Sequence, residues 1–142
     1  MTFIQADHST VGGNQRLGRQ VRAGFTRLDV LINNVGGLHE HRRETADAYE
    51  ATLAMNFVGP FALTAELVPL LRANAPSRCV IVTSAAFKMC KDDPFADVQS
   101  TAEAFVWPRG LPNGCASACR ATGNRRHDLA EATAGRRRFW AG

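Results

Sequence analysis

The sequence predicts an α/β protein whose strands form a parallel sheet. Three observations predict it: short apolar runs of strand length, helical periodicity between them, and the order strand, helix, strand, helix, strand. The chain has 142 residues, of which 45% are hydrophobic, so it suffices for one compact domain and is short for two. In such a sheet a ligand is expected in the crevice beyond the carboxyl ends of the strands.

The first half of the chain contains two predicted strands and a helix. Residues 1–7 (MTFIQAD) have the apolar run of a strand that ends in Asp7. A helix is predicted from Val11 to Thr26, although glycines in its first half weaken it by propensity. A second strand is predicted over residues 28–32 (LDVLI), where the nearly continuous apolar run is typical of a parallel strand covered on both faces.

A long helix and a third strand follow. Helical periodicity runs from Glu44 to Asn74, with a stripe that recurs every four residues at Tyr49, Leu53, Phe57 and Phe61. Pro60 lacks the N–H that a helix interior needs, so a bend is predicted over residues 58–60. The third strand is predicted from Cys79 to Thr83 and ends next to Ser84.

A change in composition near residue 101 predicts a domain boundary. Residues 102–142 are rich in arginine, alanine and glycine, with seven arginines and no lysine. Such a segment buries too little apolar surface to offset the entropy of ordering, so an irregular or disordered tail is expected after the α/β domain of residues 1–101. The net charge of +4 and the terminal arginines fit a solvated charge run better than a nucleic-acid site.

Three motifs, in the right order and at suitable separations, resemble the short-chain dehydrogenase/reductase family. LDVLINNVGG (residues 28–37) resembles its strand and Asn-Asn-Ala-Gly turn, with Val35 in the place of alanine. MNFVGPFALT (55–64) resembles its Asn-x-x-Gly helix, and VIVTSAAF (80–87) resembles the strand that delivers the active-site serine. SAAF followed by DPFADVQS also resembles the retinol-dehydrogenase-like and protochlorophyllide-reductase-like branch. The resemblance implies a partial Rossmann-like, doubly wound parallel sheet.

The resemblance implies hydride transfer between NADP or NAD and a small-molecule carbonyl or alcohol substrate. It gives Ser84 the role of orienting the substrate oxygen and gives the backbone carbonyl of Asn56 a proton-relay water. The cofactor crevice would be lined by Asp7, Asn33, Asn34, Val35 and Gly36. From the residues alone, Asn34 and Gly36 also suit the plain end of a strand, and Asp7 suits the start of a helix.

Two family features are absent from the sequence. The only tyrosine is Tyr49 and the only lysines are Lys88 and Lys91, so no Tyr-x-x-x-Lys motif exists. The chain also begins at the family's third strand, without the glycine-rich phosphate loop, and Gly12, Gly13 and Gly18 have the wrong spacing to replace it. We therefore expect an N-terminally truncated member that is catalytically incomplete as a lone chain.

The missing strands also affect the sheet. In the family's strand order residues 1–7 and 28–32 are not neighbours, which leaves only the second and third predicted strands to pair. Because exposed sheet edges can pair with another chain, the sequence is compatible with a homo-oligomer or with a completing chain. The alternative function is a non-catalytic interaction module whose basic tail binds acidic partners or RNA.

Other sequence features bound the location and chemistry of the chain. No apolar run is long enough to suggest a membrane span and the start has no leader pattern, so a cytoplasmic protein with reduced cysteines and no membrane contact is expected. Cys115, Cys119 and His127 do not have a common zinc spacing, and no metal site is predicted.

Overall fold

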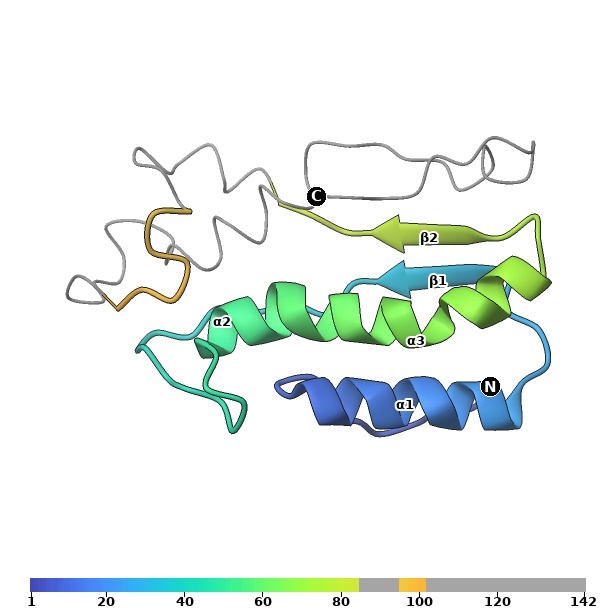
Figure 1. Cartoon of the computed structure of the whole chain (residues 1–142), viewed down its shortest axis with the longest axis horizontal. Helices are drawn as coiled ribbons and strands as arrows, with labels where there is room; N and C mark the ends of the chain where they lie inside the picture. Colours follow the sequence, from blue (N-terminus) through green and yellow to red (C-terminus); the bar gives the residue numbers. More distant parts are fainter. Residues whose placement is uncertain (85–94, 102–142) are drawn as a thin grey trace.

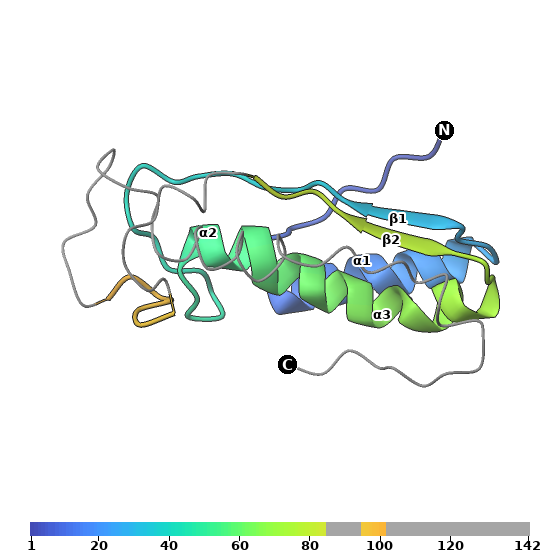
Figure 2. The ribbon, with the colours of Figure 1, turned by 90° about the horizontal axis from the view of Figure 1, so that it is seen from above.

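The computed structural model describes residues 1–84 and 95–101. Helices α1 and α3 lie side by side against one face of a two-stranded sheet, as Figures 1 and 2 show. The elements in chain order are α1 (Val11–Gly24), β1 (Val30–Asn33), α2 (Ala51–Leu53), the π-helical turn η1 (Ala54–Val58), α3 (Gly59–Ala73) and β2 (Arg78–Ile81). The predicted α/β class with a parallel sheet is confirmed.

The sheet pairs β1 with β2 in parallel, in a register that places Val30 opposite Arg78 and Asn33 opposite Ile81. These are the second and third predicted strands, so their predicted adjacency is confirmed. The prediction of a strand over residues 1–7 is wrong, because this segment adopts no strand conformation in the structure. A strand needs a neighbour to accept and donate its backbone hydrogen bonds, and the described sheet pairs β1 with β2 and does not include residues 1–7.

Helix α1 ends two residues earlier than predicted, and its glycines serve packing. A Cβ on Gly18 would lie 2.5 Å from Cβ of Glu66 in α3, and a Cβ on Gly13 would collide with the carbonyl oxygen of Asp7. The side chain of Glu66 also forms an ion pair with Arg22 across this crossing, at 3.5 Å. The glycines that weaken α1 by propensity are therefore what allows α3 and the preceding loop to approach it.

The long helix begins at Ala51, seven residues later than the predicted start at Glu44. An antiparallel bridge between Glu44 and Glu50 closes a turn whose residue Ala48 has a left-handed φ of 61°, so the chain cannot be helical there. The predicted irregularity near Pro60 takes the form of η1, in which the N–H of Gly59 reaches the carbonyl of Ala54 five residues back.

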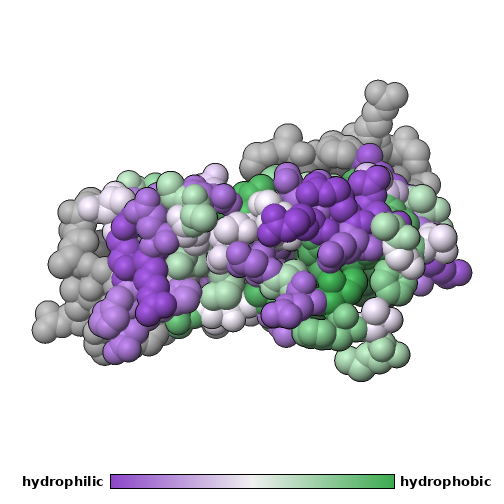
Figure 3. Space-filling model, turned by 90° about the horizontal axis from the view of Figure 1, so that it is seen from below, coloured by the Kyte–Doolittle hydropathy of each residue, from purple (hydrophilic) through white to green (hydrophobic). Residues whose placement is uncertain are grey.

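The core lies between the helices and the sheet. It is formed mainly by alanine and leucine side chains of the long helix: Ala51, Leu53, Ala54, Ala62, Leu63, Leu67 and Leu71. The helical run Ala51–Ala73 is long and apolar enough to cross a membrane by length and composition alone, yet here its leucines form the core. The surface of the molecule on the side of α1 is mostly hydrophilic, with smaller apolar patches (Figure 3).

The second face of the sheet differs from its prediction. Val30 is 46% exposed, Ile32 60% and Val80 42%, so the apolar run of residues 28–32 is not covered on both faces within the described part of the chain. Helices cover only the face toward which Asn33 turns (Figure 2). A continuous apolar run thus correctly indicated a parallel strand but not its two-sided burial.

Candidate functional site

The turn after β1 begins with a side chain that is directed into the protein. Asn33 is 7% exposed, and its Nδ2 donates a hydrogen bond of 2.9 Å to Oγ1 of Thr64 in α3. The same nitrogen lies 3.6 Å from Sγ of Cys79 in β2. Asn33 therefore joins β1 to α3 and β2, while Asn34, Val35 and Gly36 are exposed on the turn that follows.

The side chain of Asn56 holds this turn against the long helix. Its Oδ1 accepts a hydrogen bond from the N–H of Gly37 at 2.8 Å, and its Nδ2 donates to the carbonyl of Gly37 at 2.9 Å. A Cβ on Gly36 would lie 3.1 Å from Oδ1 of Asn56, and one on Gly37 would lie 3.0 Å from Cε of Met55. The two glycines allow the backbone to come this close, and the amide fixes it there with two hydrogen bonds.

The backbone of Asn56 lies in the π-helical turn η1. Pro60, four residues further on, has no N–H to donate to the carbonyl of Asn56. Such turns occur frequently at functional sites, because they redirect backbone groups that a regular helix would occupy. The predicted role of the Asn56 carbonyl stays a prediction, and the side-chain contact of Asn56 with Gly37 was not predicted from the sequence.

Ser84 lies three residues beyond the end of β2 and is exposed. Because β1 and β2 are parallel, the turn over residues 33–37 and Ser84 both follow the carboxyl ends of their strands, at the same edge of the sheet. The N–H of Val82 donates to the carbonyl of Asn33 at 2.9 Å, which continues the pairing toward this edge. The structure thus brings the predicted catalytic serine and the turn to one side of the fold.

Asp7 belongs to the start of α1. Its Oδ1 accepts hydrogen bonds from the hydroxyl and the backbone N–H of Ser9, at 2.6 and 2.9 Å, and its Oδ2 lies 3.4 Å from Oγ1 of Thr10. The Ser9 hydroxyl, followed by the Ser9 N–H, holds the pKa of Asp7 below its ordinary value, because both stabilise the charged carboxylate. These contacts place Asp7 in the turn before the N-cap Thr10, beside a polar hollow of about 110 Å³ lined by Gln5, Ala6, Asp7, Gly13, Arg16, Leu17 and Gln20. Its predicted place in the cofactor crevice stays a prediction.

Two of the first N–H groups of α1 already have acceptors within the chain. The N–H of Val11 donates to Oδ2 of Asp47 at 2.6 Å, and the N–H of Gly13 donates to Oγ1 of Thr10 at 3.1 Å. A carboxylate at this position also repels an anion. That the glycines near this helix end do not form a phosphate loop stays a prediction from their spacing in the sequence.

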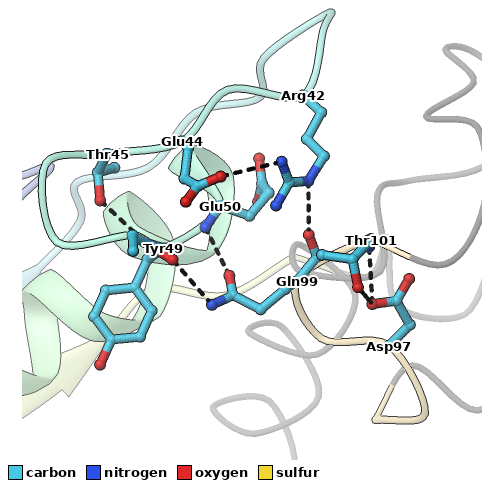
Figure 4. A network of polar contacts seen from close by, with 9 residues as sticks. Arg42, Glu44, Thr45, Tyr49, Glu50, Asp97, Gln99 and Thr101 are labelled. Carbon is cyan, nitrogen blue, oxygen red and sulfur yellow. Dashed lines mark hydrogen bonds and ion pairs between the residues drawn. The ribbon is translucent and has the colours of Figure 1, made fainter.

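A polar network lies at the amino end of the long helix (Figure 4). Glu50 is fully buried, and its two carboxylate oxygens accept the backbone N–H groups of Thr52 and Leu53 at 2.9 and 2.8 Å. The backbone N–H of Glu50 donates to Oε1 of Gln99 at 2.7 Å, across 49 residues of sequence. Sequence reasoning assigned neither residue a role, although Gln99 lies within the segment DPFADVQS. The local signal for Glu50 is an acidic residue directly before an apolar helical run.

Residues 1–92 match the family model described as short chain dehydrogenase. This chain belongs to the short-chain dehydrogenase family.

Curated relatives place this dehydrogenase chain near one branch of the family. It is 47% identical over 62 residues to mouse retinol dehydrogenase 14, which covers 44% of the chain and 19% of the relative. It is 50% identical over 84 residues to human dehydrogenase/reductase SDR family member 13, which covers 59% of the chain and 22% of the relative. These matches support the retinol-dehydrogenase-like branch, and the chain spans about a fifth of the length of these relatives.

Solved structures share the fold of this dehydrogenase chain. An NADH-dependent reductase A1-R' complexed with NAD aligns with a TM-score of 0.60 and 22% identity, over 84% of the chain and 46% of the reductase. The Pseudomonas aeruginosa RhlG/NADP active-site complex aligns with a TM-score of 0.54 and 23% identity, over 81% of the chain and 42% of that protein. At this identity the likeness confirms the Rossmann-type fold.

Several predicted features of the dehydrogenase chain lie outside the described residues. These are Lys88, Lys91, three of the cysteines (Cys90, Cys115 and Cys119), His127 and the predicted tail over residues 102–142. Cys79 is a free thiol. Tyr49 lies in the loop before α2, with its N–H donated to Oγ1 of Thr45 at 3.3 Å, and not on the helix to which the periodicity assigned it.

Proposed function

We propose that this chain supplies part of the site of an NAD(P)-dependent oxidoreductase that interconverts an alcohol and a carbonyl compound. The observation that carries the proposal is the pair of hydrogen bonds by which Asn56 holds Gly37. These bonds fix an exposed glycine turn at the carboxyl ends of the strands, where this class of sheet binds its ligand. Family membership and the likeness to an NAD-complexed reductase support the choice of cofactor.

The residues of the chain fit part of this chemistry. The exposed turn over residues 34–36 allows a cofactor to approach the backbone closely, because Gly36 carries no side chain. Ser84 offers a hydroxyl that can orient the substrate oxygen, and the carbonyl of Asn56 can hold a water in the π-helical turn. A nicotinamide cofactor supplies the hydride when it is bound.

The proposal assigns no turnover to these 142 residues by themselves. Proton transfer from a positioned acid contributes about two to four powers of ten to the rate. Tyr49, the only tyrosine in the sequence, precedes α2 and therefore comes before Ser84 in the chain. No lysine follows Tyr49 within one helical turn. We propose that a completing chain supplies the proton donor, and that the completing chain or a second copy of the present chain supplies further sheet strands.

The substrate class follows the curated relatives. Retinol dehydrogenase 14 and mouse polyprenol dehydrogenase, which is 38% identical over 87 residues, are named for apolar alcohols. We therefore propose an apolar alcohol or its aldehyde as the substrate. The alternative, a basic interaction module, depends on residues 102–142 and predicts salt-sensitive RNA binding that deletion of this segment abolishes.

Site mapping by NMR tests the proposal. Addition of NADPH at millimolar concentration should shift the backbone amide signals of Asn34, Gly36, Gly37 and Ser84, and the Asn56→Ala variant should reduce these shifts. The Asn74→Ala variant, altered at the opposite end of the long helix, should leave them intact. Shifts confined to the start of α1, or none at any concentration, would contradict the proposed site.

A further inference from the structure

A fully buried asparagine lies in helix α1. Asn14 has no exposed surface, and its Nδ2 donates hydrogen bonds to the carbonyls of Thr10 and His8, at 2.8 and 3.2 Å. Its Oδ1 lies 2.8 Å from Nδ1 of His8. A buried amide costs free energy unless its donors and its acceptor have partners, and here all of them do. The Asn14 amide therefore ties α1 firmly to the residues that precede the helix.

The two carbonyls fix the orientation of the Asn14 amide. A rotated amide would place its oxygen against the carbonyl oxygens of Thr10 and His8, neither of which has a hydrogen to donate. Oδ1 therefore faces the ring of His8, so Nδ1 of the neutral imidazole carries the proton that it donates to Asn14. The Nδ1–H tautomer of His8 is thus a measurable signature of this contact.

Helix α1 runs beside the long helix (Figure 1), and the buried cluster meets that helix at Gly59. A Cβ on Gly59 would lie 2.6 Å from the carbonyl oxygen of His8 and 2.8 Å from Nδ2 of Asn14. It would also lie 3.2 Å from the carbonyl oxygen of Ala54. Because two of these atoms belong to the backbone, any side chain at Gly59 would force the two helices to shift.

The turn that Gly59 closes contains Asn56. The N–H of Gly59 reaches the carbonyl of Ala54 five residues back, and Asn56 lies between them in the π-helical turn η1. Such turns are rare in helices, and unusual backbone conformations persist where the surrounding structure maintains them. At the Gly59 end of this turn, the maintaining contacts come from the amide of Asn14 and the carbonyl of His8.

We propose that Asn14 is a positioning residue that supports the π-helical turn at Gly59 and thereby fixes the position of Asn56. The assignment rests on the proposed function, in which the side chain of Asn56 holds the site turn at Gly37. Asn14 acts on the site through the long helix, from a neighbouring element. The assignment adds α1 to the elements that shape the candidate site.

NMR of the full chain without cofactor tests the assignment. Asn14→Ala removes the three side-chain hydrogen bonds and leaves space for water to reach the carbonyls. The amide signals of Asn56 and Phe57 should shift, and the amide of Gly37 should exchange at least about threefold faster. The ring nitrogen signals of His8 should report the Nδ1–H tautomer in the wild-type chain and a mixture of tautomers in the variant.

The matched control is Asn74→Ala. Nδ2 of Asn74 also donates to two backbone carbonyls, at the carboxyl end of the same long helix. This variant should lower stability to a similar extent, yet leave the signals of Asn56 and the exchange of Gly37 unchanged. Equal effects of the two substitutions would indicate general loosening and would overturn the proposal. An unmoved Asn56 in the Asn14→Ala variant would overturn it as well.

Gly59→Ala tests the same contact from the long helix. Its new Cβ would displace the carbonyl of His8 and the amide of Asn14, so the ring nitrogen signals of His8 should change together with the amide signal of Asn56. Unchanged ring signals would overturn the proposal, and so would an Nε2–H tautomer of His8 in the wild-type chain. These measurements contain no cofactor, so failure of NADPH to shift the 34–37 turn would refute the proposed function and leave them readable.

Discussion

Replacing Asn56 with alanine should release the turn that follows β1. The substitution removes two hydrogen bonds to Gly37, of 2.8 and 2.9 Å, in partly buried surroundings. At about 1 kcal/mol for each bond, the loss is about 2 kcal/mol of unfolding free energy. A difference of this size corresponds to a change of about thirtyfold in a local opening equilibrium. Urea unfolding should report the loss of stability, and hydrogen exchange at Gly37 should accelerate by about this factor.

A matched substitution separates the turn from general stability. The Nδ2 of Asn74 also makes two hydrogen bonds, to the carbonyls of Leu70 and Thr26 at 2.8 and 3.2 Å. Asn74→Ala should therefore lower stability by a similar amount while the amide of Gly37 stays protected. If Gly37 exchanges equally fast in wild type and in Asn56→Ala, Asn56 does not hold the turn and the reasoning about the site fails.

Three further predictions concern packing and ionisation. Gly18→Ala should destabilise the protein by about 1–2 kcal/mol despite its better helix propensity, because the new Cβ would lie 2.5 Å from Cβ of Glu66. Gly24→Ala, at the last residue of α1, has nothing within 4 Å and should be neutral or slightly stabilising; urea unfolding of both variants decides. Hydrogen bonds from the Ser9 hydroxyl and N–H lower the pKa of Asp7, so its contribution to stability is present above the ordinary value of 3.8 and is lost as the pH falls through the lower folded value. An NMR titration should therefore find a higher pKa in Ser9→Ala, and an unchanged one would refute the assignment. Burial raises the pKa of the Cys79 thiol against the opposing hydrogen bonds from Thr64 and Asn33, so alkylation at neutral pH should be slower than for an exposed cysteine, and equal rates would contradict this.

Local patterns predicted elements whose causes are local. Helix α1 begins at the predicted Val11 because Thr10 caps it, with Oγ1 accepting the N–H of Gly13 at 3.1 Å. The start of the long helix was predicted too early because hydrophobic periodicity does not report the left-handed backbone conformation of Ala48. Residues 1–7 were wrongly predicted as a strand because strand formation depends on a pairing partner, which the sequence of one segment does not reveal.

The sequence motifs did not indicate the contacts that the candidate site residues make. Short family motifs pointed to Asn56 and Gly36 as candidate site residues. The hydrogen bonds of the Asn56 side chain, however, join it to Gly37, 19 residues away in the sequence. The contact between Gln99 and Glu50 spans 49 residues and has no motif. Such contacts arise from tertiary packing, and hydrogen-bonding capacity in the sequence does not specify a distant partner.

A fluorescence titration of the purified chain with NADPH tests the central claim most directly. The claim is that the chain holds the turn of a dehydrogenase site without a phosphate cradle, since its sequence has no glycine-rich phosphate loop and the N–H groups of Val11 and Gly13 at the start of α1 are accepted by Asp47 and Thr10. The account predicts no saturation of nicotinamide fluorescence in the micromolar range. Saturable micromolar binding would contradict it, and survival of that binding in the Asn56→Ala variant would mean that another part of the chain holds the cofactor.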